Sequence, residues 1–283
     1  MSAPAVSERQ PAYERDPADA RRVPGSMVMA LREFRFWLVN YRRTWKGTIY
    51  SSILNPVLYL GAMGLGLGKL VDQHGHLGRL GGVSYLVFLA PGLLAAAAME
   101  TAMGESTYPV LGSVKWLKTY YAAAAAPLRP RDIFHGHLMF TTMRLIMNCA
   151  IFLVVMSAFG AVKSGWVIAT LPVAVLTGLA FAAPIEAFAI TRDKDSSFAA
   201  LFRFGMIPMF LFSGTFFPVT QLPAWIRPLA YITPLWHGVE LCRSLSLGTA
   251  DLGGSLVHAG YLVALAAVGI AVGQRTYRRR LYV

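Results

Sequence analysis

The chain has 283 residues, of which 55% are hydrophobic and only 14% are charged. Soluble domains carry about 25% charged residues, so this composition excludes an ordinary soluble enzyme and indicates a membrane protein. In a soluble protein, the formal net charge of +12 would point to a nucleic-acid partner. The two cysteines have the spacing of neither a disulfide framework nor a metal site.

The first 46 residues divide into two parts. Residues 1–25 hold four prolines among alanines, arginines and acids, a composition that predicts a disordered cytoplasmic tail. Residues 26–46 predict an amphipathic helix, whose apolar positions recur at spacings of three and four: Leu31, Phe34, Leu38, Tyr41 and Trp45. A basic, aromatic helix of this kind suits the inner membrane interface. The alternative is that it packs on the rest of the protein.

Six runs without Lys, Arg, Asp or Glu follow, at 47–68, 80–99, 145–162, 164–185, 204–226 and 252–274. About 20 apolar residues in a helix cross the hydrocarbon of a bilayer, and only a helix satisfies its own backbone there. The sequence therefore predicts an all-α membrane protein. Residues 47–273 would form a transmembrane domain with six spans, at about 47–68, 82–104, 137–160, 166–189, 199–217 and 254–273. The later half of the fifth run is interfacial in composition.

The basic residues are distributed unequally between the two sides of these spans. One side, which includes both termini and the basic tail 274–283, carries 20 Lys and Arg, and the other carries five. Cytoplasmic segments retain an excess of these residues, so we expect both termini in the cytoplasm. The same asymmetry explains the net charge, and no nucleic-acid partner is expected.

The glycines between residues 61 and 69 do not have the spacing of a phosphate-binding loop. Gly64 and Gly68, like Gly269 and Gly273 in the last span, are instead typical of helices that approach closely. No other segment resembles a nucleotide site. If ATP drives this protein, another chain must bind it.

Glu100, Arg144 and Glu186 are charged residues that fall within the predicted spans. The predicted topology places all three in the third of the bilayer nearest the cytoplasm. Because intramembrane charges are costly unless paired, Arg144 is expected to pair with one or both carboxylates and to tie spans two, three and four together. The alternative is that each side chain reaches the interface separately.

The segment between spans two and three is the most informative cytoplasmic part. An alanine run at 122–126 favours a helix, and Pro127 and Pro130 end it. A short exposed helix flanked by prolines and charges would suit docking of a partner. From its residues alone, the segment is equally compatible with a plain loop.

Several motifs resemble those of the ABC-2 type transporter permeases. Gly214-Thr-Phe-Phe-Pro-Val, then Leu222-Pro and Trp225, are followed by Pro234-Leu-Trp-His237 and Glu240-Leu-Cys-Arg243. Glu105-Ser-Thr-Tyr108 and the run from Pro127-Leu to Asp132-Ile resemble the inner loop of the same family. Over about residues 27–283, the chain is most similar to the nodulation-factor (lipo-oligosaccharide) exporter and daunorubicin-exporter permeases.

The resemblance implies six spans with an N-terminal amphipathic elbow helix, a cytoplasmic coupling helix, and extracytoplasmic re-entrant or interfacial helices before the last span. It implies two copies of an ABC ATP-binding subunit, which would hold ATP and magnesium, and a second permease chain, with a homodimer favoured. The permease itself would be no enzyme and would bind no cofactor or metal. The implied ATPase-coupling residues are Tyr120, Tyr121, Pro127, Leu128, Arg129, Arg131 and Asp132.

A second set of residues forms a candidate outer gate or substrate path. Aromatic rings at the outer interface suit both a sugar face and a lipid tail, although an ordinary interfacial aromatic belt is the alternative. The set comprises Phe216, Phe217, Pro218, Trp225, Trp236, His237, Glu240 and Arg243.

The resemblance implies export of a lipid-linked oligosaccharide or similar amphiphile across the bacterial plasma (inner) membrane, driven by a separate ATPase and in contact with membrane lipids. Export of a hydrophobic drug or antibiotic is an alternative that these residues do not separate from it. A membrane-embedded transferase is a remote third class, since it needs a catalytic base that the sequence does not offer.

Overall fold

The computed structural model describes residues 25–73 and 82–282. These residues form helices and connecting turns, and none of them lies in a strand. The expected disordered tail therefore falls almost entirely outside the described residues. The α-helices are α1 Ser26–Tyr59, α2 Gly68–Gln73, α3 Tyr85–Ser106, α4 Tyr108–Lys115, α5 Thr119–Ala125, α6 Pro130–Ala158, α7 Thr170–Ala189, α8 Ser196–Ala200, α9 Ile207–Phe212, α10 Arg227–Ile232, α11 Pro234–Leu247 and α12 Leu252–Leu281.

Five helical segments of the described chain are long and apolar enough to cross a membrane: Ser26–Gln73, Tyr85–Lys115, Pro130–Ala158, Gly165–Ala189 and Leu252–Leu281. This confirms the all-α membrane class. A sixth apolar helix, Ser196–Phe212, is shorter than the other five. It comprises α8, a π-helical stretch Leu201–Met206, and α9.

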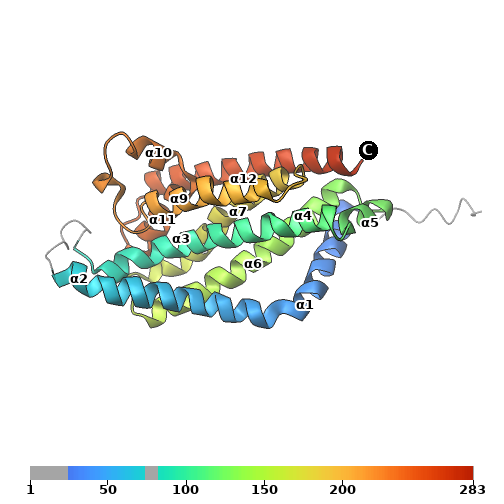
Figure 1. Ribbon diagram of the computed structural model, residues 1–283. Coiled ribbons are helices and arrows are strands. Elements are labelled where there is room, and N and C mark those ends of the chain that lie inside the picture. The colour runs from blue at the N-terminus through green and yellow to red at the C-terminus, as the bar shows by residue number, and fades with distance from the viewer. Residues whose placement is uncertain (1–24, 74–81, 283) are drawn as a thin grey trace, which may run out of the picture.

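The N-terminal helix is continuous where the sequence predicts two elements. From α1 the chain passes through a π-helical stretch, Leu60–Leu67, into α2 without a break. Figure 1 shows that this helix is bent, with a steep first part and a long second part beside α3 and α6. The described helices also differ from the expected bounds at other ends: α6 begins at Pro130, α9 ends at Phe212, and α12 continues through the basic tail to Leu281.

The long helices pack around α3 and α7. Of the five long segments, the one containing α3 is the most buried, whereas those containing α1 and α12 keep most of their apolar surface exposed. A Cβ atom on Gly269 of α12 would lie 2.6 Å from the backbone nitrogen of Pro184 in α7, and one on Gly273 would lie 2.5 Å from the ring of Phe134 in α6. The predicted role of these glycines in close helix packing is confirmed.

The two ends of the bundle differ in what they carry. Figure 1 places the start of α1, the short helices α4 and α5, and the C-terminus at one end. The opposite end carries α2 and α10 together with the start of α11. The basic residues that precede α6 and end α12 therefore meet at the end that carries both termini of the described chain.

Candidate functional site

The coupling segment forms a sharp corner between α4 and α5. Lys118 has a φ of 53°, the only positive value at a non-glycine residue in the described chain. This conformation turns the chain back toward α6 after α4. The corner leaves Trp116 58% exposed and Leu117 72% exposed, and Tyr121 is exposed as well. Sequence reasoning missed Trp116 and Leu117, although an aromatic and an aliphatic residue between two lysines was a usable signal.

Tyr120 does not belong to this exposed surface. Its side chain is 0% exposed, so it lies beneath the surface that a partner subunit could contact, and a part in coupling would have to act through other residues. Its hydroxyl lies 2.6 Å from Nδ1 of His137 in α6. The imidazole of His137 stacks on Trp37 of α1 with ring centroids 4.3 Å apart, and Trp37 Nε1 donates to Glu33 at 3.1 Å. Tyr120 therefore fastens α5 to α6 and, through His137, to α1.

The remaining residues of the expected coupling set have different positions. Pro127 is exposed in the turn after α5, and Leu128 packs partly against the main core. Asp132 is buried and accepts a hydrogen bond from the backbone N–H of Arg129 at 3.2 Å, which fixes the start of α6. Arg129 and Arg131 are exposed, and they line a cavity together with the end of α12.

The expected pairing among the intramembrane charges is wrong. Arg144 pairs with Glu105 of α3, with Nε 2.8 Å from Oε1, and its other partner is the hydroxyl of Tyr41 in α1 at 3.0 Å. Glu186 is fully buried and accepts a hydrogen bond from Thr141 at 3.2 Å. The predicted second span ends at residue 104, before Glu105. In the structure α3 extends to Ser106, so the helix carries Glu105 to the level of Arg144.

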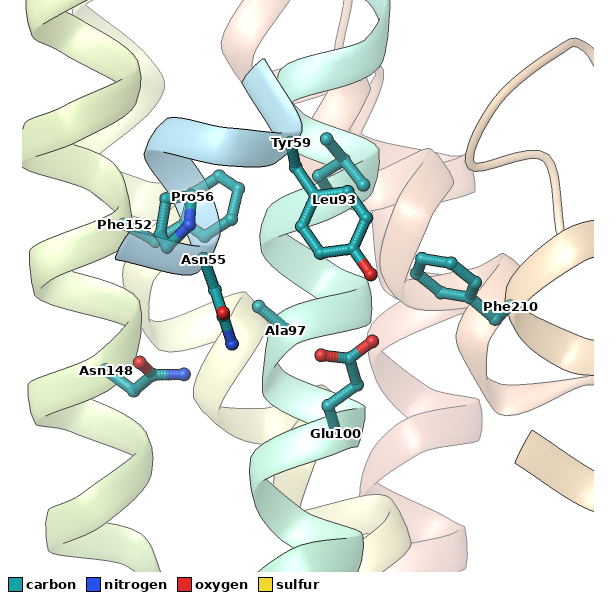
Figure 2. Close-up of a pocket in the computed structure, with 9 residues that line it drawn as sticks. All are labelled: Asn55, Pro56, Tyr59, Leu93, Ala97, Glu100, Asn148, Phe152 and Phe210. Carbon is teal, nitrogen blue, oxygen red and sulfur yellow. The ribbon is translucent and has the colours of Figure 1, made fainter. Parts of the chain in front are cut away.

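Glu100 lies instead in a small pocket of about 30 Å³ between α1, α3, α6 and α9, which we call the central pocket. Figure 2 shows the carboxyl of Glu100 and the hydroxyl of Tyr59 pointing toward each other, with the amides of Asn55 and Asn148 close by. Asn148 is held by a hydrogen bond of 2.6 Å from Nδ2 to the hydroxyl of Thr101. The other lining residues are Pro56, Leu93, Ala97, Phe152 and Phe210.

The chemistry of the central pocket is mixed. Two carboxamides, a phenol and a carboxyl supply hydrogen-bond donors and acceptors, and the rings of Phe152 and Phe210 supply apolar faces. Polar groups of this kind are costly to place within a bilayer, and those found there often mark a substrate path. No hydrogen bond joins Glu100 to another described residue. The pocket can therefore offer hydrogen bonds to a polar group that enters it.

Arg243 organises the opposite end of the bundle. Its guanidinium donates to the carbonyl oxygens of Gly214 at 2.7 Å and Phe88 at 3.2 Å, pairs with Glu240 at 3.0 Å, and lies 3.9 Å from the centre of the Phe88 ring. Gly214 has a φ of 80°, a value that suits glycine and ends α9 in a turn. Arg243 and Glu240 are thus part of the frame that holds this turn against α3.

The aromatic residues of the candidate outer gate separate into three environments. Phe216 packs edge-on against Phe210 of the central pocket, with centroids 5.0 Å apart. Phe217 and Trp236 pack against a small separate cluster around Val219, and Pro218 precedes the short helix Val219–Gln221. Trp225 is 76% exposed.

His237 belongs to a further contact between α11 and α12. Its Nδ1 lies 2.8 Å from Nδ1 of His258, and its ring stacks on Tyr261 with centroids 4.0 Å apart. Burial and the neighbouring His258 together lower the pKa of His237 to about 4 from an ordinary value of 6.5, so His237 is neutral at pH 7. The contact between the two ring nitrogens holds α11 against α12.

Comparison with known proteins identifies the family. The family model of the ABC-2 type transporter matches residues 27–247. The chain is similar to Nodulation protein J of Rhizobium leguminosarum bv. trifolii, with 33% identity over 87% of this chain and 94% of the relative. It is 32% identical to Nodulation protein J of Rhizobium leguminosarum bv. viciae and 31% identical to that of Rhizobium meliloti strain 1021, each over 87% of this chain. The chain therefore belongs to the ABC-2 type transporter family, as its motifs indicate.

Proposed function

We propose that this chain is the permease subunit of an exporter that moves a lipid-linked oligosaccharide or similar amphiphile out across the bacterial inner membrane. Membership of the ABC-2 type transporter family supports the general activity. The match to relatives named Nodulation protein J covers nearly the whole length of those relatives. The observation that carries the substrate class is the central pocket, which sets hydrogen-bonding groups beside aromatic rings among apolar helices. Such a lining suits a substrate with a sugar part and a lipid part.

The proposed topology has six crossings with both termini in the cytoplasm. The short segment Ser196–Phe212 supplies the fifth crossing. The short α10 and the largely buried α11 are the interfacial or re-entrant helices before the last crossing. The first part of α1 serves as the interfacial elbow helix. The basic residues at the end of the bundle that carries α5 and the C-terminus support this orientation.

The energy comes from a separate ATP-binding subunit, in two copies, which holds ATP and magnesium. Its contact surface on this chain is the corner of Trp116, Leu117 and Tyr121, whose exposed aromatic and aliphatic groups suit the core of a protein interface. Buried Tyr120 transmits movement of that corner to α6 and α1 through His137 and Trp37. The exposed apolar faces of α1 and α12 are available to lipid and to a second copy of the chain, and a homodimer is favoured.

The chemistry of the central pocket favours a sugar over a drug. Its space of about 30 Å³ is about that of one water molecule, so the surrounding helices must separate before a sugar unit can enter. Three of its four polar side chains are neutral groups that both donate and accept, which match hydroxyl and acetamido groups. Glu100 is the feature that would favour a cationic drug.

Transport into proteoliposomes tests the proposal. The chain and its ATP-binding subunit are reconstituted together, and uptake of a labelled lipo-oligosaccharide and of an anthracycline is measured with and without ATP. We expect ATP-dependent uptake of the lipo-oligosaccharide, a strong reduction by Asn148→Leu, and none by the matched surface change Asn40→Leu. Uptake of the anthracycline alone would replace the proposed substrate class by the drug class. Uptake by the chain without its ATPase would refute the permease mechanism.

A further inference from the structure

A second cavity lies between the start of α6 and the end of α12, and it is lined almost entirely by basic and polar side chains. We call it the basic cavity. It has a volume of about 470 Å³, is open to one side, and is lined by Arg129, Pro130, Arg131, Gln274, Arg275, Arg278 and Tyr282. Its four arginines come from two segments far apart in the sequence, so a run of basic residues in the tail does not account for it. Folding brings the two pairs together.

The charges of this cavity are poorly compensated by the described residues. Asp132 is the nearest acid, but its side chain is 1% exposed, its Oδ1 lies 3.7 Å from Arg131 Nε, and its oxygens already accept hydrogen bonds from Ser26 and from the backbone of Arg129. By contrast, Arg280 in the same last turn of α12 has its own partner, Asp193. No ion pair within the described chain involves Arg275 or Arg278. Four guanidinium groups around one opening repel each other, and a bound anion would offset this repulsion.

The depth of the cavity identifies the kind of anion. The 23 residues from 252 to 274 contain no charged side chain, so α12 crosses the hydrocarbon before Arg275 appears as its first charge. At the start of α6, Arg129 directly before the helix and Arg131 in its first turn likewise precede its apolar part. Tyr282 is 57% exposed, as suits an aromatic ring at the level of lipid headgroups. The arginines thus lie at the height of the phosphates of the inner leaflet, under the topology proposed above.

We propose that the basic cavity binds the phosphate-bearing headgroup of an anionic phospholipid, with a headgroup of two phosphates as the best match for two pairs of arginines. Arginine binds phosphate oxygens through two parallel N–H groups, and basic pockets between membrane helices on the cytoplasmic side are suited to such headgroups. Gln274 joins α12 to α6 at the cavity through Nε2, 3.0 Å from His135 Nε2. A bound headgroup would reinforce this contact beside the coupling helix.

Binding of cardiolipin to the full chain in a neutral detergent tests the proposal by native mass spectrometry. Each arginine near an anionic surface strengthens binding about fivefold, so Arg275→Gln with Arg278→Gln should weaken cardiolipin binding about 30-fold. The matched control, Arg35→Gln with Arg279→Gln, removes the same charge from exposed positions outside the cavity and should weaken cardiolipin binding far less than the cavity variant does. Phosphatidylcholine should bind weakly to all three proteins. Equal loss in both double variants would overturn the proposal, since it would mean binding to diffuse charge alone.

Two further measurements distinguish a lipid headgroup from a soluble anion and from a protein partner. If inorganic pyrophosphate displaces cardiolipin at equal concentration, the site is one for a soluble anion, and the lipid proposal is wrong. If the cavity variant loses the ATP-binding subunit while it keeps cardiolipin, the cavity is a protein contact instead. Should this variant fail to fold, Arg129→Gln with Arg131→Gln removes the other pair of arginines from the same cavity and should weaken cardiolipin binding by a similar factor. None of these readouts depends on the transported substrate, so they remain decisive if the proposed export activity fails.

Discussion

Replacing Glu105 by glutamine tests the ion pair that joins α3 and α6. The side chain of Arg144 is 9% exposed and that of Glu105 is 20% exposed, so the pair is mostly shielded from water. Without the carboxylate, Arg144 keeps only the hydroxyl of Tyr41 and the face of its ring, 4.8 Å from the guanidinium carbon. Removal of one partner of a buried pair costs about 3–5 kcal/mol, and the residual exposure favours the lower value.

The expected loss of about 3 kcal/mol can be measured as a shift in thermal stability. At about 2 °C per kcal/mol for a chain of this size, Glu105→Gln should lower the Tm by roughly 6 °C. The assay is the fraction of monodisperse protein that remains in detergent after heating. The double variant Glu105→Gln with Arg144→Gln should recover part of the loss, because no charge is left unpaired.

Glu100→Gln is the matched control for this prediction. It makes the same chemical change in the same helix, in a pocket where no described residue pairs with the carboxyl. We expect little change in Tm and, under the proposed function, an effect on transport instead. The reasoning is refuted if Glu100→Gln destabilises the protein as much as Glu105→Gln does, or if the double variant is no more stable than Glu105→Gln alone.

Three other predictions concern single contacts. Gly269→Leu should abolish folded protein, measured as monodisperse yield, because its side chain would overlap the backbone at Pro184; normal yield would contradict the close packing of α7 and α12. Tyr120→Phe removes the hydrogen bond to His137 and should lower the free energy of unfolding by only about 1 kcal/mol, with a small fall in Tm. It should nevertheless lower the amount of substrate transported per ATP hydrolysed, and an unchanged transport ratio would contradict the transmitting role. Since the folded pKa of His237 is about 4, stability should fall as pH decreases from 6.5 to 4 and level off below, and His237→Gln should flatten that slope of Tm against pH.

The sequence by itself determined the class of protein and the position of most membrane helices. The charge-free runs predict helices because transfer of a segment into hydrocarbon depends mainly on its own composition. The family could also be recognised, since motifs such as Gly214 with the following Phe-Phe-Pro are local. The glycines of the last helix correctly predicted close packing, although their partners, Pro184 and Phe134, were not apparent.

The tertiary structure alone decided which side chains meet. The sequence offered Glu100 and Glu186 as partners of Arg144, but Glu105 holds that position because α3 extends further than its charge-free run. Tyr120 was expected among the coupling residues of an exposed helix, whereas its own side chain is buried and its hydroxyl contacts His137 of α6. Each of these contacts joins residues on different helices, so it depends on the rotation and depth of both helices, which the composition of neither one fixes.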